Sequence, residues 1–374
     1  MSMMDRILRL MAERKASDVY LSAHAPAIIK INGQYIPMNS QILPVEATVN
    51  LLAEVVPPNR IEELKETGEL NMAIPLADVG NFRLSAMRQR GTYAAVIRYI
   101  SSEIPSLPTL NLPNVLADLV MEKRGLILMV GATGAGKSTT LASMLDHRNE
   151  NVMGHILTIE DPVEFVFRNR KSVVNQREVG SDTETLAIGL KNALRQAPDV
   201  IMIGEVRTRE GMDHAIAFAE TGHLVLCTLH ANNANQAMDR IINFFPEDRR
   251  NQLLMDLSLN IKGVVAQQLI PTPDGKGRKV AMEILLGTPL VQDYIRDGEI
   301  HKLKEVMKES TNLGMKTFDQ ALFELYQAGE ISYEDALRFA DSQNEVRLKI
   351  KLAQGGDART LAAGLDGVEV AEVR

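Results

Sequence analysis

The sequence predicts an α/β protein of two domains followed by a helical C-terminal region, and three observations support this class. Helix-like and strand-like stretches alternate from Asn114 to about residue 287, as is typical of a parallel sheet covered on both faces. An apolar run at 126–130 stops at a glycine-rich loop. Upstream, segment 104–113 holds three prolines within nine positions, and because proline fixes φ and lacks an N–H donor, no regular element can run through it.

At 374 residues the chain exceeds one ordinary hydrophobic core, so we expect separate domains. The expected parts are a smaller α+β domain at 1–103, a proline-rich linker at 104–113, an α/β domain at 114–287, a helical region at 288–353 and a disordered tail at 354–374. The linker is stiff enough to act as a hinge strap, and a static surface loop is the plainer alternative.

The first domain is predicted to be a small sheet with helices on one side. Apolar spacing predicts helices at 4–13 and 45–55, the second stopping at Pro57-Pro58. Asn32-Gly33 supplies a hairpin turn. The expected strands are 18–22, 27–31, 34–36, 81–87 and 92–100.

In the second domain we expect four strands and a hairpin, at 125–130, 155–159, 200–203, 223–229, and 268–270 with 280–285. The hairpin turn is 273–277. In the helical region, Thr317 and Ser332 each begin a sequence typical of a capping box, and Gly329 can end the first of these helices.

Composition narrows the class of protein. Forty-one basic against forty-eight acidic residues give a net charge of −7, which argues against broad nucleic-acid binding through backbone neutralisation. No run is long enough for a membrane span and no signal-peptide core is found, so we expect a cytoplasmic protein. The single cysteine, Cys227, excludes a disulfide framework and is expected to be a buried strand residue.

The glycine-rich loop fits the pattern GxxxxGK[ST] of a P-loop. Its backbone N–H groups would surround an anion, Lys137 would reach the β- and γ-phosphates, and the Ser138 hydroxyl would bind Mg²⁺. The following helix would direct its positive N-terminus at the same phosphates. A chance match in a flexible loop is the alternative, and the strand before and helix after count against it. The expected nucleotide-binding residues are Gly131, Ala132, Thr133, Gly134, Ala135, Gly136, Lys137, Ser138 and Thr139.

Three carboxylates, Glu160, Asp161 and Glu164, follow the strand 155–159, which we expect beside the P-loop strand. We favour Glu164 as the group that orients and deprotonates the attacking water, with Glu160 and Asp161 supporting the metal. A solvated acidic loop is the alternative.

The strand 200–203 also ends near an acid, Glu205, where P-loop ATPases use a carboxylate to hold Mg²⁺ through water. The usual Asp is replaced by Gly204 followed by Glu205, and a surface Glu-Arg pair with Arg207 is the alternative. His223 and His230 bracket the next strand at a separation of seven, so they are poor candidates for one metal site. His230 lies where a γ-phosphate sensor would, although a satisfied loop histidine is nearly as good an interpretation.

Arginines in the last strands of the first domain are candidates for phosphate contacts. Arg83 and Arg98 sit inside strand patterns and are expected to share a face, whereas Arg88 and Arg90 lie in or near the turn. An ordinary solvated charge is the alternative for any one of them.

With the P-loop, Ile159-Glu160-Asp161-Pro162-Val163-Glu164, Gly204-Glu205 and Thr221-Gly222-His223 to Thr228-Leu229-His230 in this order, the chain resembles the secretion ATPase superfamily, and within it the type IV pilus retraction ATPases of the PilT and PilU kind. The resemblance runs from about Lys15 to Thr317. Four ordered motifs are far more specific than a P-loop alone.

The resemblance implies a ring-shaped homohexamer with a PAS-like N-terminal domain and a RecA-like P-loop ATPase domain, which binds ATP and Mg²⁺ at the domain junction. It implies that Glu164 is the catalytic glutamate, that Glu160 and Asp161 belong to an acidic box, that Glu205 is the Walker B acid, and that His223 and His230 form a histidine box. By position, Arg83 and Arg98 are the best matches to the arginines that complete the site. With the P-loop, the expected catalytic residues are Glu164, Glu205, Lys137, Arg83 and Arg98, and the expected metal residues are Ser138, Glu160 and Glu205. The implied partners are a PilT-like retraction ATPase and an inner-membrane pilus platform protein, with no nucleic acid expected.

One motif departs from the PilT pattern. The retraction sequence Ala-Ile-Arg-Asn-Leu-Ile-Arg-Glu is here 290–297, Leu-Val-Gln-Asp-Tyr-Ile-Arg-Asp, and matches only at Ile295 and Arg296. Together with the longer tail, this favours the PilU branch, which implies an accessory motor working with PilT. Two other function classes stay open: a nucleotide-binding scaffold that docks on a motor with little turnover, and a RecA-type nucleic-acid translocase.

Overall fold

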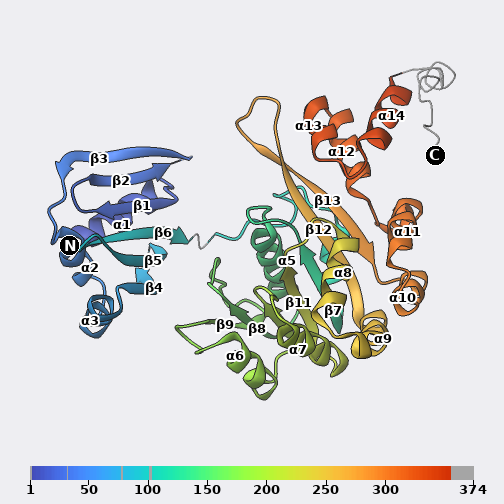
Figure 1. Cartoon of the computed structure of the whole chain (residues 1–374), viewed down its shortest axis with the longest axis horizontal. Coiled ribbons are helices and arrows are strands. Elements are labelled where there is room, and N and C mark those ends of the chain that lie inside the picture. Colours follow the sequence, from blue (N-terminus) through green and yellow to red (C-terminus); the bar gives the residue numbers. More distant parts are fainter. Residues whose placement is uncertain (1, 32, 77–78, 101–102, 355–374) are drawn as a thin grey trace, which may run out of the picture. The chain divides into compact units, whose positions relative to one another are not determined.

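The computed structural model describes residues 2–31, 33–76, 79–100 and 103–354, and the chain divides into two compact units. The first unit comprises Met1–Ile104, Pro162–Asn169 and Gln176–Thr185, and the second comprises Pro105–Asp161, Arg170–Asn175 and Leu186–Arg374. Figure 1 labels the elements of both. Apart from Gln354, the tail that we expected to be disordered lies outside the described residues.

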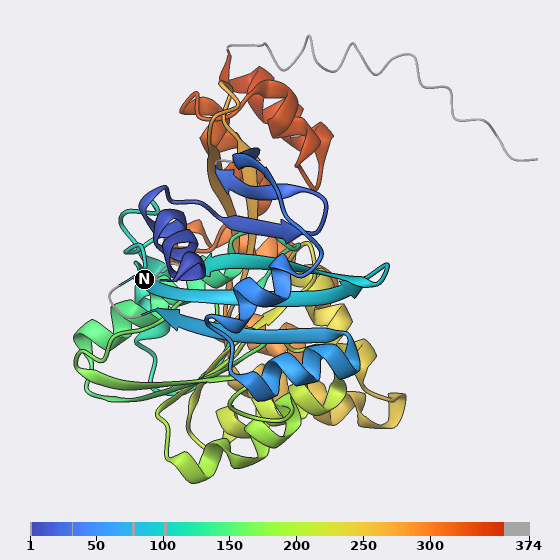
Figure 2. The same cartoon turned by 90° about the vertical axis from the view of Figure 1, so that its left-hand side faces the viewer.

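The first unit contains a six-stranded antiparallel sheet in the order β3-β2-β1-β6-β5-β4 (Figure 2, blue to cyan). The strands are β1 (Asp18–Ser22), β2 (Pro26–Ile31), β3 (Gln34–Ile42), β4 (Glu69–Leu76), β5 (Gly80–Gln89) and β6 (Thr92–Ile100). The helices are α1 (Met3–Glu13), α2 (Ala47–Ala53) and α3 (Pro58–Thr67).

One hydrophobic core joins the three helices to the sheet. Alternate strand residues such as Phe82 and Leu84 are fully buried, because successive side chains of a strand point to opposite faces. They pack in one cluster with helix residues that include Leu8, Leu52 and Leu64. The sheet with its packed helices therefore follows the apolar pattern of the sequence.

Two elements of this unit were not predicted. Helix α2 ends before Pro57-Pro58, as expected, but Pro58 also begins α3, because the first N–H groups of a helix have no intrahelical partner and proline is tolerated there. Gly68, with φ of 84°, ends α3, and β4 follows with Leu70 and Ile74 buried. Asn32 of the expected hairpin turn lies outside the described residues.

The second unit is built on a seven-stranded sheet in the order β13-β12-β7-β11-β10-β8-β9. Neighbours from β12 to β8 are parallel, and β13 is antiparallel to β12. Every residue of β7, β10 and β11 is buried, as in parallel sheets covered on both faces. The strands are β7 (Gly125–Val130), β8 (Gly154–Glu160), β9 (Ser172–Glu178), β10 (Val200–Ile203), β11 (Leu224–Leu229), β12 (Ile261–Pro271) and β13 (Arg278–Leu286).

The helices of this unit flank the sheet and continue beyond it (Figure 1). Those of the α/β part are α4 (Val115–Val120), α5 (Lys137–Asn151), α6 (Leu186–Ala193), α7 (Arg209–Glu220), α8 (Ala234–Phe244) and α9 (Arg250–Asn260). The C-terminal region adds α10 (Pro289–Arg296), α11 (Leu303–Glu309), α12 (Phe318–Gln327), α13 (Tyr333–Arg338) and α14 (Gln343–Ala353). Among the described residues no helix is both long and apolar enough to cross a bilayer.

The strand order corrects one expectation. We expected β8, which leads to the acidic segment, beside the P-loop strand β7, but β11 and β10 lie between them. The hairpin is also longer than expected, because β12 begins at Ile261. This strand pairs with β7 along one side and with β13 along the other. Strand β9, at the sheet edge, was not predicted.

The proline-rich stretch contains turns and no helix or strand between 105 and 113. Leu107 and Leu112 are buried, and the Ser143 hydroxyl donates a hydrogen bond of 2.6 Å to the Pro105 carbonyl. This part of the linker is therefore packed into the second unit. Further on, Thr317 and Gln320 form the expected capping box of α12, while the Ser332 side chain accepts a hydrogen bond from the Asp335 N–H.

Candidate nucleotide site

The glycine-rich loop connects β7 to α5, as the sequence predicted. Gly136 is the N-cap of α5 and has a left-handed conformation with φ of 86°. A Cβ at Gly131 would lie 2.6 Å from the Gln267 carbonyl oxygen, and one at Gly136 would lie 2.7 Å from Gln267 Nε2. Both positions therefore require glycine because β12 passes close to the loop.

Gln267 holds the loop and the helix together. Its side-chain oxygen accepts a hydrogen bond of 2.8 Å from the Thr140 hydroxyl of α5, and its Nε2 donates one of 2.7 Å to the Ala135 carbonyl. The residue is 2% exposed. Its role depends on contacts between distant segments of the chain, which no local motif indicates. Gln267 was therefore not predicted from the sequence.

Lys137 lies at the start of α5 with its ammonium directed into the loop. Nζ donates to the carbonyls of Gly131 and Ala132, at 2.7 and 2.9 Å, and the residue is buried. Ala132, Thr133 and Gly134 at the loop apex are exposed. A buried cation thus lies beside an exposed glycine-rich loop at a helix N-terminus, which is the kind of place where proteins bind phosphate.

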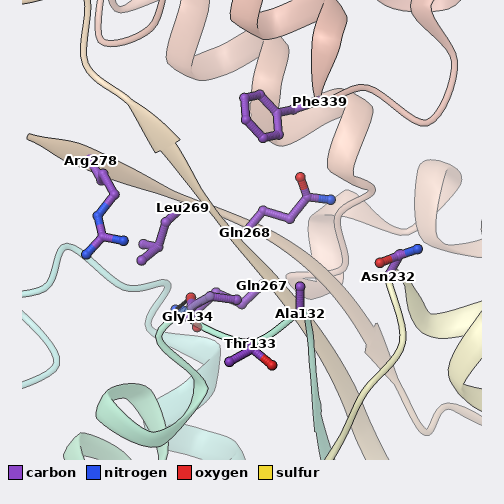
Figure 3. Close-up of a pocket in the computed structure, with 10 residues that line it drawn as sticks. Ala132, Thr133, Gly134, Asn232, Gln267, Gln268, Leu269, Arg278 and Phe339 are labelled. Carbon is purple, nitrogen blue, oxygen red and sulfur yellow. Dashed lines mark hydrogen bonds between the residues drawn. The ribbon is translucent and has the colours of Figure 1, made fainter. Parts of the chain in front are cut away.

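A cavity of about 280 Å³ adjoins this loop. Figure 3 shows Ala132, Thr133 and Gly134 on one side and Phe339 on the other. Gln268 and Leu269 of β12 and Arg278 of β13 complete much of the wall, with Asn232 from the segment after β11. None of these outer residues was predicted to belong to the site, because they come from distant parts of the chain.

Glu205 follows β10 and contacts two side chains, those of Arg207 and His230. Arg207 Nη2 lies 2.7 Å from Glu205 Oε2, and His230 Nε2 lies 3.1 Å from Glu205 Oε1. Burial alone would raise the pKa of Glu205, but the Arg207 hydrogen bond and the charges of His230, Arg207 and Lys137 together hold this pKa below its usual value. The Glu-Arg pair that we considered as an alternative is therefore present. The charge of the P-loop lysine also acts on its carboxylate.

Gly204 brings the ends of β8 and β10 close together. A Cβ at Gly204 would lie 3.1 Å from Glu160 Cα, and the pairing of Ile203 with Ile159 sets the register. Glu160 is 6% exposed and accepts a hydrogen bond of 2.6 Å from the Thr158 hydroxyl. Gly204 thus stands in place of the usual Asp, at a position where the two backbones are in close contact. The acid, Glu205, follows one residue later.

The oxygen donors suit Mg²⁺ chemically. Hydroxyl and carboxylate oxygens, here Ser138, Glu205 and Glu160, are the ligands that this hard cation prefers. Within the described part of the chain, no three His, Cys, Asp or Glu side chains form a metal site by themselves. Bound Mg²⁺ would therefore depend on phosphate and water oxygens as well, which is usual for this ion.

Glu164 belongs to the first unit, whereas Lys137 and Glu205 belong to the second. It is exposed on a segment without helix or strand. Gln176 steadies this segment, since its Oε1 accepts from the Phe167 N–H at 2.9 Å and its Nε2 donates to the Phe165 carbonyl at 2.7 Å. The catalytic role of Glu164 stays a prediction.

Arg83 and Arg98 are paired directly across β5 and β6, so their side chains leave the same face of the sheet. Arg98 Nε lies 2.9 Å from Asp18 Oδ1, a carboxylate that is 3% exposed, while the Arg98 side chain is 64% exposed. Arg88 instead donates to the Lys65 carbonyl. The shared face agrees with our expectation, and the phosphate contacts stay a prediction.

The two histidines lie at opposite ends of β11. His230 contacts Glu205 at the carboxyl end, whereas His223 Nδ1 lies 3.0 Å from the Phe218 carbonyl oxygen before the strand begins. They do not share a site. Cys227 is buried within the strand, and burial raises the pKa of its thiol to about 12.

Comparisons with known proteins agree with this geometry. The family described as type II/IV secretion system protein matches residues 2–336. The chain is 53% identical over 366 residues to the type IV pilus ATPase PilU of Pseudomonas aeruginosa, covering 98% of this chain and 96% of that protein. The PilT retraction ATPase of the same organism is 37% identical over 330 residues, with coverage of 88% and 96%.

A crystal structure of the pilus retraction motor PilT with bound ADP is similar in fold. The TM-score is 0.86 at 37% identity, covering 92% of this chain and 98% of that one. The expected fold class, a P-loop ATPase domain with a smaller N-terminal domain and a helical C-terminal region, is confirmed, as is the resemblance to the PilT and PilU kind.

Replacing Gln267 by Ala should loosen the P-loop. The change leaves the Ala135 carbonyl and the Thr140 hydroxyl without their partner, which should cost about 1–3 kcal/mol of unfolding free energy. Urea unfolding measures the loss, and Gln268→Ala, a half-buried neighbour on the same strand, is the matched control. Equal stability of the two variants would contradict the role of Gln267.

Proposed function

Because this chain belongs to the type II/IV secretion system protein family, we propose that it is an Mg²⁺-dependent ATPase that converts ATP and water to ADP and phosphate and assists the retraction of type IV pili. The observation that carries the proposal is the buried Lys137 ammonium inside the glycine loop, whose charge reaches the Glu205 carboxylate. Lys137 follows the loop after β7 and Glu205 follows β10, at the edge where an open parallel sheet binds its ligands.

Binding begins with an exchange of partners at Lys137. Its Nζ now donates to two neutral carbonyls of the loop. Phosphate oxygens carry negative charge and accept stronger hydrogen bonds, so a triphosphate at the loop apex would draw the ammonium toward the β- and γ-phosphates. The exposed N–H groups of residues 132–134 would bind the remaining oxygens.

Hydrolysis requires charge to be stabilised and a water molecule to be oriented. Ser138 and Glu205, with Glu160 on the neighbouring strand, would hold Mg²⁺, which supplies charge neutralisation on the phosphates. The lowered pKa keeps Glu205 ionised at neutral pH for this role. Glu164 is proposed as the base that orients water, His230 as the γ-phosphate sensor, and Arg83 and Arg98 as further phosphate contacts.

The motor that we propose is a homohexamer in the cytoplasm, attached to the inner membrane through a pilus platform protein and working with a PilT-like ATPase. Its physical basis is differential binding: contacts to the γ-phosphate stabilise one arrangement of the protein, and the loss of that phosphate removes them. The similarity to PilU and PilT over nearly the whole chain supports this assignment.

Lys137→Ala should abolish ATP turnover, because the charge that meets the β- and γ-phosphates is lost. Glu164→Gln should bind ATP and release phosphate at least ten times more slowly, as is typical when a water-orienting base is removed. Steady-state phosphate release and binding of a fluorescent ATP analogue measure the two steps. Lys276→Ala, in the exposed hairpin turn, is the control.

Wild-type turnover by Lys137→Ala would refute the P-loop assignment. Tight ATP binding by the wild type without turnover would indicate instead a nucleotide-binding scaffold that docks on a partner motor. Stimulation of phosphate release by DNA would indicate a nucleic-acid translocase.

Deleting the gene should leave pili on the cell surface while twitching motility falls, since retraction rather than assembly is lost. Expression of the wild-type chain should restore motility, and expression of Lys137→Ala should not. Pili are counted by electron microscopy and motility is measured on agar. Loss of surface pili would point to pilus extension, and unchanged motility would count against any retraction role.

A further inference from the structure

Glu283 of β13 is a buried acid that the proposed chemistry does not use. It is 1% exposed. Its Oε1 accepts a hydrogen bond of 2.8 Å from the Ala234 N–H, and its Oε2 accepts one of 3.4 Å from the Phe318 N–H. Ala234 and Phe318 are the first residues of α8 and α12, so one carboxylate binds the N-termini of two helices. Helix N-termini favour a negative charge.

The contacts continue into the C-terminal helices. Asn233, the N-cap of α8, donates from Nδ2 to Asp341 Oδ2 at 3.3 Å, and Lys304 Nζ lies 3.0 Å from the same oxygen. Asp319 of α12 accepts hydrogen bonds from the N–H groups of Asp341 and Ser342, at 2.9 and 3.3 Å. These residues connect the start of α8 to α11, α12 and α14.

The same network reaches the nucleotide site through a short segment. His230 contacts Glu205, and Ala234 contacts Glu283, with Ala231, Asn232 and Asn233 between them. Asn232 lines the cavity beside the P-loop. Phe339, two residues before Asp341, lines the same cavity from the opposite side (Figure 3). Fixing α8 and the C-terminal helices therefore fixes two walls of the cavity.

A purely structural acid is the simpler interpretation, because helix N–H groups need acceptors wherever they are buried. The position of Glu283 argues for more than this. Each of its two hydrogen bonds ends on a different helix, and one of these helices directly continues the segment from His230. The Asn233 side chain caps α8 locally at the Gln236 N–H, and Glu283 adds an acceptor for the Ala234 N–H from a distant strand.

We propose that Glu283 is a positioning residue for nucleotide binding, which holds the segment 230–233 against the cavity and couples that segment to the C-terminal helices. This inference rests on the proposed ATPase function. Residues on the C-terminal helices, far along the chain from the P-loop, then influence the affinity for the nucleotide.

The protonation of Glu283 gives a first measurement. Burial, and to a smaller extent the charge of Asp341, raise its pKa to about 7, against the lowering effects of the N–H groups of Ala234 and Phe318 and of the charge of Lys304. Because this pKa lies above its unfolded value, the group's contribution to stability is full below pH of about 4.5 and is lost as pH rises through 7. Glu283→Gln should remove this dependence.

The melting temperature of Glu283→Gln relative to wild type should therefore rise between pH 5 and pH 8. Asp319 and Asp341 are the other carboxylates of the network, so Asp341→Asn is compared in the same series. If the melting temperatures of wild type and Glu283→Gln changed in parallel with pH, the Glu283 carboxyl would titrate like an exposed one, which contradicts its place between the two helices.

The decisive experiment compares full-length wild type, Glu283→Gln, Asp341→Asn and the control Glu330→Gln, whose acid forms a partly exposed ion pair with Lys279. Amide exchange of the region 230–240 and the Kd for a fluorescent ATP analogue are measured, together with KM and kcat. We expect faster exchange at the start of α8 and a several-fold rise in Kd and KM, with a smaller change in kcat; Asp341→Asn provides a milder change should Glu283→Gln fail to fold.

Faster exchange with unchanged Kd and KM would mean that Glu283 is only structural and would overturn the inference, as would unchanged exchange. If the wild type binds ATP but shows no turnover, the proposed enzyme fails, whereas exchange and Kd still decide the role of Glu283.

Discussion

The hydrogen bonds of the Gln267 side chain fix the P-loop against the strand and the helix beside it. This side chain is one buried amide that joins β12, the glycine loop and α5 through a hydrogen bond donated and one accepted. The side-chain amide lies where a Cβ of Gly136 would be, and the backbone carbonyl of Gln267 lies where a Cβ of Gly131 would be, so neither glycine can carry a side chain. Buried polar groups of this kind fix one geometry when all their partners are present. The loop is thereby shaped before any phosphate arrives.

The sheet places the charged residues by a different constraint. Parallel strands end at one edge, so the residues after β7, β11, β10 and β8 meet there although they are far apart in the chain. His230 follows β11 and Glu205 follows β10, and these adjacent strands bring the two side chains within 3.1 Å. Charges from separate segments thus act on one group, because those of His230 and Lys137 both lower the pKa of Glu205.

Features encoded by a few neighbouring residues could be predicted from the sequence. The P-loop, the acid after β10, the capping box at Thr317 and the buried Cys227 all follow from local patterns. The order of strands could not be predicted, because nothing in the segment 155–164 states which strand lies beside it. Gln267 was missed for the same reason, since its partner Thr140 is 127 positions away. Helix α3 was not predicted because proline both ends and begins helices, and only the end of the preceding helix was expected at Pro57-Pro58.

The buried thiol of Cys227 has a practical consequence. A thiol with a pKa near 12 inside a strand forms almost no thiolate at neutral pH, and thiolate is the form that reacts with maleimides and iodoacetamides. The sequence contains no other cysteine. Cysteines introduced on two exposed loops would therefore accept a donor and an acceptor fluorophore, and the distance between them could be followed by energy transfer without first removing the native residue.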